Sequence, residues 1–455
     1  MAGDCSPTAV SPTTTTSRSA TASHRGSIVT SPWPTFTDRI SMPPACPRPA
    51  RLWVVSELYY PEQTSTGYFL TRIAEGLARS MPVEVVSGQP TYSEQGLRAP
   101  SREERGGVLI HRVPATHFSK DRLALRALNV LTLSLSIAWF ALTRFRRGDR
   151  LLVVTNPPTL PPLVGLIARW KRIDAHLLVH DVYPEVLSAT GFLRADGIAY
   201  RLLARLFAAT FRLYGSIVVL GRDMAEVVRA KLGATSEEEG ERITIIANWG
   251  DVDEIVPLSR ERNPFLTSNG IDAPCVIQFS GNIGRTHDVE TILAAARRLR
   301  GRPDIMFVFV GYGGKTGAVA EAIASGELLN VRLLPRQPRE MLGPMLASAT
   351  ATIIAFVGDM KGLSVPSRMY NVLSAGTPII AIADPDSELA LVVREEQAGW
   401  VLAPGDVAAL AALVENLANK QGMAEARRRG ANGRAAVVMR YTLASVIDRF
   451  RTLIG

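Results

Sequence analysis

Glycine-rich turns beside cationic side chains are the feature of this sequence with the clearest chemical meaning. The stretch Gly281–Arg285 follows a strand-like run and precedes a helix-like run. Glycines let backbone amides approach an anion closely, and a helix N-terminus adds positive potential. Arg285 can donate two hydrogen bonds to a diphosphate. The stretch therefore predicts a phosphate-binding loop, and a tight turn beside a surface arginine is the plainer alternative.

The stretch Val365–Pro378 is a second candidate for anion binding. Pro366 and Ser367 suit the first turn of a short helix, and Gly376 suits its end. An ordinary capped helix explains the same residues. The cluster Gly311–Lys315 also follows a strand-like run, but no acid follows at the spacing of a dinucleotide site, which argues against NAD.

Titratable side chains gather where another predicted strand ends. His180, Asp181 and Glu185 follow an apolar run, and the loop 63–67 joins a strand to a helix in the same half of the chain. We expect both segments to face one cleft. The structural alternatives are a partly buried histidine at His180 and an ordinary helix N-terminal charge at Glu185.

Alternating strands and helices must position these stretches. Short, nearly all-apolar runs such as Leu151–Thr155 and Met306–Val310 alternate with runs of helical period. This alternation predicts an α/β fold of parallel sheets covered on both faces, with ligands outside the carboxyl ends of the strands. We expect two doubly wound, Rossmann-like domains at 51–252 and 275–440, joined by a linker at 253–274 and facing an interdomain cleft.

Composition narrows the class of partner. The 455 residues are 47% hydrophobic and carry a net charge of +9, which predicts a folded protein with an anionic partner. Scattered basic residues without interleaved aromatics argue against nucleic acid. Three widely spaced cysteines cannot form a disulfide framework or a common zinc site, and they predict a reducing compartment. Residues 1–50, rich in Ser, Thr and Pro, predict a disordered tail or an upstream start codon chosen in error.

An uncharged apolar run at 127–143 lies between clusters of basic residues. It is shorter than the roughly 20 residues of a typical membrane span. Three interpretations stay open: a buried core helix, a helix in the plane of an anionic membrane interface, and a true span.

The order of these stretches resembles that of family 4 glycosyltransferases, in particular the branch that builds bacterial capsule, colanic acid and O-antigen chains. The matching stretches are Leu58–Glu62, His180–Glu185, Asn248–Asp251, Gly281–Arg285 and Val365–Pro378, and they span nearly all of residues 51–455. The resemblance implies the GT-B fold, a nucleoside diphosphate sugar held mainly by the second domain, retention of anomeric configuration, and no metal or other cofactor. It also implies that a last helix, at 441–455, returns to the first domain.

The resemblance assigns roles to particular residues. The donor-binding candidates are Gly67, Gly281, Asn282, Gly284, Arg285, Lys361, Pro366, Ser367, Arg368 and Asn371. The catalytic candidates are Asp181, His180 and Glu185 near the acceptor hydroxyl and Arg285 at the leaving group. Many members carry two glutamates where this chain has Leu363 and Asn371. Asn371 can still hydrogen-bond a ribose, whereas Leu363 cannot bind a sugar hydroxyl.

The resemblance therefore predicts a retaining hexosyltransferase of cell-surface polysaccharide synthesis. The apolar stretch at 127–143 with its basic flanks, together with the net charge, predicts a lipid-linked acceptor, a saccharide carried on a polyprenyl diphosphate. The predicted place of the enzyme is the cytoplasm, peripheral on the inner face of the bacterial cytoplasmic membrane. Two alternatives are a GT-B sugar-nucleotide epimerase or hydrolase, and a non-catalytic nucleotide-binding subunit of a polysaccharide assembly complex.

Overall fold

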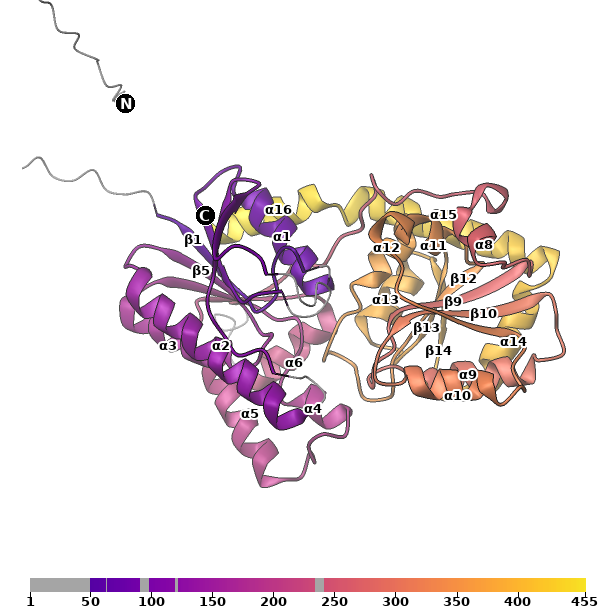
Figure 1. Ribbon diagram of the computed structural model, residues 1–455, viewed down its shortest axis with the longest axis horizontal. Helices are drawn as coiled ribbons and strands as arrows, with labels where there is room; N and C mark the ends of the chain where they lie inside the picture. The colour runs from indigo at the N-terminus through magenta and orange to yellow at the C-terminus, as the bar shows by residue number, and fades with distance from the viewer. Residues whose placement is uncertain (1–49, 63, 91–97, 119–121, 234–240) are drawn as a thin grey trace, which may run out of the picture. The chain divides into compact units, whose positions relative to one another are not determined.

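The computed structural model describes residues 50–455 apart from 63, 91–97, 119–121 and 234–240 (Figure 1). The predicted tail at 1–50 therefore lies outside the described residues except for Ala50. The described part contains two sheets, one in each half of the chain, as the alternation of strands and helices predicts.

The sheet of the first half has eight strands in the order β3-β4-β2-β1-β5-β6-β7-β8. All neighbouring strands pair in parallel except β3 and β4, which pair antiparallel. The strands are β1 (Leu52–Val55), β2 (Val83–Ser87), β3 (Arg102–Arg105), β4 (Val108–Arg112), β5 (Arg150–Val154), β6 (Asp174–Leu178), β7 (Ser216–Val219) and β8 (Ile243–Ile245). The helices are α1 (Ser65–Leu77), α2 (Leu123–Arg144), α3 (Leu160–Lys171), α4 (Glu185–Ala189), α5 (Ile198–Phe211) and α6 (Arg222–Leu232).

The sheet of the second half is fully parallel, in the order β11-β10-β9-β12-β13-β14. The strands are β9 (Cys275–Asn282), β10 (Ile305–Tyr312), β11 (Val331–Leu334), β12 (Ala351–Ala355), β13 (Ile379–Ile382) and β14 (Gly399–Leu402). The helices from residue 253 on are the 3-10 turns η1 (Arg260–Arg262) and η2 (Arg339–Met341), with α8 (Pro264–Ser268), α9 (Val289–Arg298), α10 (Thr316–Ala324), α11 (Leu342–Ala347), α12 (Arg368–Ser374), α13 (Glu388–Glu395), α14 (Val407–Leu417), α15 (Lys420–Arg440) and α16 (Leu443–Ile454).

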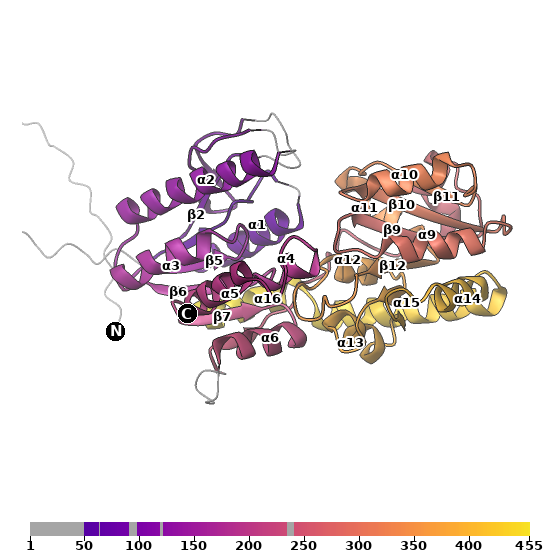
Figure 2. The same ribbon diagram turned by 90° about the horizontal axis from the view of Figure 1, so that it is seen from below.

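Helices cover both faces of the first sheet. Neighbouring helices α2, α3 and α5 lie on one face, and α1 and α16 lie on the other (Figures 1 and 2). The last helix, α16, packs against α1 of the first half. A β-carbon at Gly76 of α1 would lie only 2.4 Å from Ile447 of α16, so glycine permits this close helix contact.

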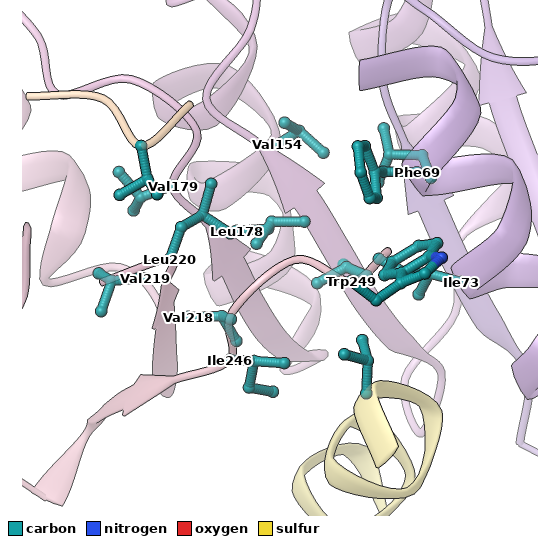
Figure 3. Close-up of a cluster of buried hydrophobic side chains, with 14 of the residues drawn as sticks. Phe69, Ile73, Val154, Leu178, Val179, Val218, Val219, Leu220, Ile246 and Trp249 are labelled. Carbon is teal, nitrogen blue, oxygen red and sulfur yellow. The ribbon is translucent and has the colours of Figure 1, made fainter. Parts of the chain in front are cut away.

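The core of the first half continues up to the junction with the second. Trp249, which follows β8, is buried and meets Phe69 of α1 edge-to-face, with ring centroids 4.5 Å apart. Ile73, Val218 and Ile246 belong to the same buried cluster (Figure 3). The Asn248–Asp251 stretch is therefore anchored by burial of an indole.

The structure adds three features to the sequence expectations. Strand β3 consists only of Arg and Glu, so it has no apolar signature, and an exposed sheet edge tolerates such residues. The predicted linker contains α8, whose Phe265 and Leu266 are buried. The run at 127–143 lies within the longer helix α2, where Leu133 and Ile137 are buried in the core and Leu135 and Trp139 are exposed.

Candidate functional site

Two glycines bring the carboxyl ends of β9 and β10 into backbone contact. Gly281 and Gly311 are paired in register and have φ angles of +116° and +136°. A β-carbon at Gly311 would lie 2.0 Å from the carbonyl oxygen of Gly281, a distance that no other residue tolerates. The backbone amide of Lys315 also donates to the carbonyl of Ile283 at 2.8 Å. Gly281 and Gly311 thus lie in paired strand ends and not in turns. These strand ends, with the contact between Ile283 and Lys315, form one surface that we call the glycine wall.

The guanidinium of Arg368 lies directly against this wall. Its Nη1 donates to the carbonyl oxygen of Ser280 at 2.5 Å, and its Nη2 donates to Nε2 of His287. The cation also lies over the ring of Phe279, 4.9 Å from its centroid. Burial lowers the pKa of Arg368 to about 10, so the side chain stays charged at neutral pH. A fixed cation beside glycine strand ends can bind a phosphate group.

His287 holds Arg368 and was missed by the sequence analysis. Burial, together with the charge of Arg368, holds the pKa of His287 well below its ordinary value. The neutral ring therefore accepts a hydrogen bond from Arg368, and it stacks on Phe356 with centroids 5.7 Å apart. The available signal was its position six residues after Gly281.

The rest of the predicted loop reaches toward the first half of the chain. Asn282 and Arg285 are exposed, whereas Gly284 is buried. The Cζ atom of Arg285 lies 5.1 Å from the ring centroid of Phe192, which precedes α5. Arg285 thus takes part in a contact between the two halves, and Arg368 is the cation fixed in the glycine wall.

Pro366 and Ser367 immediately precede Arg368 and lead into α12. Lys361 lies nearby on the chain, with its Nζ 3.7 Å from Glu226 of the first half and 3.9 Å from Asp386. A small recess between the halves is lined by Asp223, Phe356, Met360, Lys361, Ser364, Pro366, Ala383, Asp384, Ser387 and Leu389. The structure therefore brings Lys361 and Pro366 together at the junction of the two halves.

Asn371, the predicted ribose partner, takes part in a network between the halves. Its Oδ1 accepts a hydrogen bond from the amide of Asp251 at 3.1 Å. The carboxylate of Asp251 in turn accepts from the hydroxyl of Tyr68 at 2.7 Å and from Arg339 at 3.2 Å. Leu363, at the other position where many family members carry a glutamate, is buried. These two positions therefore contribute to packing and to contacts between the halves in this chain.

In the first half, the structure brings together the loop before α1 and the end of β6. Gly67 is buried, and the Thr66 hydroxyl lies 3.3 Å from Nδ1 of His180. Burial lowers the pKa of His180 to about 4. Asp181 forms an isolated β-bridge with Ser364 of the second half, and burial raises the pKa of Asp181. His180 and Asp181 thus lie where the two halves meet.

Glu185 has a different environment from its two sequence neighbours. Its Oε1 forms an ion pair with Nζ of Lys231 on α6 at 2.6 Å, and the Lys231 side chain is almost fully buried. The Tyr200 hydroxyl lies 3.5 Å from the same oxygen. This arrangement ties α4 to α6, so Glu185 has a structural partner that sequence reasoning could not identify.

Asp223 at the start of α6 is a second junction residue that the sequence analysis missed. Its Oδ2 accepts from the amides of Gly362 and Glu388, each at 2.9 Å, and burial raises its pKa. The neighbouring Arg222 forms ion pairs with Glu388 and Glu395. These partners are more than a hundred residues away along the chain, which is why no local pattern reveals them.

The described residues contain no group of three or more His, Cys, Asp or Glu side chains that could hold a metal ion. Arginine and lysine side chains place positive charge near the junction, among them Arg368 and Lys361.

Two known families match successive parts of the chain. Residues 66–249 match the family described as "Glycosyl transferase 4-like domain", and residues 266–436 match "Glycosyl transferases group 1". The probable glycosyltransferase WbjE of Pseudomonas aeruginosa is 31% identical over 369 residues, which cover 81% of this chain and 89% of WbjE. The putative colanic acid biosynthesis glycosyltransferase WcaI of Escherichia coli K12 is 23% identical over 344 residues, which cover 73% of this chain and 83% of WcaI.

Solved structures support the same assignment at the level of fold. Sucrose-phosphate synthase from Thermosynechococcus elongatus superposes with a TM-score of 0.67 at 14% identity, covering 89% of this chain and 98% of that protein. Anabaena HepE in complex with UDP superposes with a TM-score of 0.63 at 13% identity, covering 89% and 99%. With both sheets arranged as in GT-B enzymes and both halves matched, the chain belongs to the group 1, family 4-like glycosyltransferases.

Proposed function

We propose that this enzyme transfers a hexosyl group from a nucleoside diphosphate sugar to a saccharide acceptor during synthesis of a cell-surface polysaccharide, with retention of anomeric configuration. The observation that carries the proposal is the partly buried Arg368, held by hydrogen bonds beside the paired strand ends at Gly281 and Gly311. The UDP complex of a protein with the same fold supports a nucleotide donor. The colanic acid relative supports the polysaccharide class.

The charge that develops during this reaction fits the groups at the junction. The bond between the anomeric carbon and the diphosphate oxygen breaks, so negative charge grows on the leaving phosphate. Arg368 can stabilise that charge, as can backbone amides of the glycine wall, and each preorganised donor of this kind contributes a factor of about 10²–10³ in rate. Arg285 and Lys361 add positive potential at the edge of the site.

The acceptor hydroxyl is expected to approach from the first half. Its oxygen forms the new bond to the anomeric carbon, and its proton passes to the departing diphosphate on the same face of the sugar. His180 and Asp181 lie at the end of β6, where they can orient this hydroxyl. For the acceptor we propose a saccharide on a polyprenyl diphosphate, because the apolar stretch at 127–143, its basic flanks and the net charge favour a lipid-linked substrate.

Nucleotide binding and transfer test this proposal separately. A thermal-shift screen of nucleoside diphosphates and their sugars identifies the donor, because a ligand that binds the native state stabilises it. We expect Arg368→Ala to weaken binding of that donor about 100-fold or more and Arg368→Lys to restore part of it. Arg427→Ala, which removes an exposed arginine of α15, is the matched control.

Two results would contradict the proposal. Unchanged donor affinity in Arg368→Ala would remove Arg368 from the site. Rapid turnover of the nucleotide sugar without any acceptor would favour an epimerase or hydrolase. We expect Arg285→Ala to reduce transfer greatly while leaving the fold intact, and near-normal turnover in that variant would exclude the predicted role of Arg285.

A further inference from the structure

Helix α2 carries a continuous apolar stripe on its outer side. Its exposed residues follow one another at intervals of three and four, the spacing of one face of a helix. They are Leu128, Leu131, Leu135, Trp139 and Leu142. The Trp139 side chain is 70% exposed. By length and composition the helix could span a membrane. Only 22% of its most apolar 18-residue stretch is buried inside the protein, so most of this stretch is accessible from outside.

Two neighbouring helices extend the stripe into a surface. Leu166 and Trp170 are exposed on α3, and Trp170 is 73% exposed. Ile198, Leu202 and Leu206 are exposed on α5 at intervals of four residues. Helix α3 packs against both α2 and α5, and the three helices lie on the same face of the first sheet (Figure 2). We call the ten exposed residues of these helices the apolar face.

The apolar face points away from the protein, and α2 stays on the sheet. Leu133, Ile137 and Ala141 on the inner side of α2 are buried in the core. Lys171 of α3 donates to the carbonyls of Ala141 and Phe145 at the end of α2. A helix fixed in this way cannot leave the fold to span a bilayer, but its outer side is available to an apolar phase.

Basic residues surround the apolar face. Lys and Arg occur five times in residues 122–147, three times in 160–172 and four times in 194–212, and Asp196 is the only acid in these ranges. Arg126, Arg144, Arg146, Arg147 and Arg169 are among those that are exposed. An apolar centre with a cationic rim complements an anionic bilayer, whose acyl region takes the apolar residues and whose headgroups take the arginines.

We propose that the apolar face of α2, α3 and α5 docks this enzyme onto the surface of an anionic lipid bilayer. The charges favour a bilayer over a second copy of the chain, because a two-fold symmetric dimer through this face would bring the cationic rims of both copies together. The proposal concerns binding alone and does not depend on the sugar donor or on catalysis.

The position of Phe192 links this surface to the candidate site. Phe192 is exposed, lies between α4 and α5, and contacts Arg285 of the glycine-rich loop. Docking through the neighbouring α5 therefore keeps the junction of the two halves close to the bilayer. This last step rests on the proposed function, for it would let a lipid-linked saccharide reach the junction without leaving the membrane.

Flotation of the full chain with vesicles tests the docking surface without donor or acceptor. We expect binding to phosphatidylglycerol–phosphatidylcholine vesicles and much weaker binding to phosphatidylcholine alone. The variant Trp139→Ser/Trp170→Ser should lose at least about tenfold in affinity, and Arg144→Glu/Arg147→Glu a similar factor. Lipids brominated in the acyl chains should quench tryptophan fluorescence of the wild type more strongly than that of the double tryptophan variant.

Matched variants outside the apolar face are the controls. Leu329→Ser/Met439→Ser removes two exposed apolar residues, and Arg298→Glu/Arg427→Glu reverses two exposed cations; neither should change vesicle binding. Wild-type protein that does not float with anionic vesicles would overturn the proposal. So would a wild-type dimer that becomes monomeric in the double tryptophan variant, since the face would then be an interface between copies. Neither result would bear on donor binding to Arg368.

Discussion

The helices over the two sheets bury similar inner sides but have different outer sides. Of the seventeen large hydrophobic residues exposed in the described part of the chain, ten lie on α2, α3 and α5 over the first sheet. None lies on α9 or α14 over the second sheet. The exposed residues there are charged or small, such as Glu290, Arg298 and Ala412.

This difference distinguishes the apolar residues that folding requires from those that it does not require. Burying a sheet requires an apolar inner side on each covering helix, and both halves meet that requirement. Folding does not require an apolar outer side, and a large exposed apolar patch usually marks an interaction surface. The two halves also place their cations differently: the first half exposes arginines around an apolar face, whereas the second half holds the partly buried Arg368 against Ser280 and His287.

Two substitutions on opposite sides of α2 give the largest expected difference. Ile137 is fully buried and Leu135 is 54% exposed. We expect Ile137→Ala to lower the free energy of unfolding by about 2–5 kcal/mol, because it leaves a cavity, and Leu135→Ala to change it by less than about 0.5 kcal/mol. Denaturant unfolding measures both. Similar losses would mean that Leu135 packs against something in the folded chain, and the apolar face would have to be redefined.

Acid should destabilise both halves through histidines whose pKa is lowered by burial, among them His180 in the first half and His287 in the second. The native pKa of His180, about 4, lies below the value of about 6.5 of an unfolded histidine, because of burial. The unfolded state therefore binds more protons below pH 6.5. The contribution of His180 to stability is complete above that pH and falls by about 2–3 kcal/mol as the pH drops to 4. His287 acts in the same direction, with the charge of Arg368 added to burial.

Substituting either histidine should reduce this acid sensitivity. Unfolding midpoints of His180→Gln measured between pH 7 and pH 4 should fall less steeply than those of the wild type. His287→Gln should show the same change and should also weaken donor binding, because Arg368 loses its hydrogen-bond partner. His117→Gln, at an exposed position in the first half, is the control. An unchanged pH profile in His180→Gln would mean that its ring is accessible to protons in the native state.

Raising the salt concentration should distinguish the exposed arginines around the apolar face from Arg368. This is the smallest of the three predicted effects. Raising the ionic strength from about 0.05 M to about 0.5 M shortens the Debye length severalfold. Vesicle binding through the exposed arginines should weaken by about fivefold or more, whereas donor binding to the partly buried Arg368 should change by less than about threefold. Flotation and calorimetric titration measure the two. Equal salt dependence would show that Arg368 is solvated in the native protein.

The sequence predicted the elements and the loops well because their signals are local. Apolar runs predicted the strands of both sheets apart from β3. The glycines at 281 and 311, which were predicted to lie in turns after the strands, lie in the paired strand ends of the glycine wall. Strand β3 was missed because its residues are all charged. The partners of Glu185 and Asn371 were also missed, since Lys231 and Asp251 lie 46 and 120 residues away along the chain.

By itself, the sequence determined two doubly wound halves, the family and the glycine loops, because nearest-neighbour patterns encode strands, helices and turns. Only the tertiary structure decided which cation enters the glycine wall, since His287 and Arg368 are 81 residues apart and meet through strand order. It also decided that the apolar run of α2 is one part of a three-helix surface. Three separate stripes become one surface only when right-handed crossovers place their helices on the same face of a sheet.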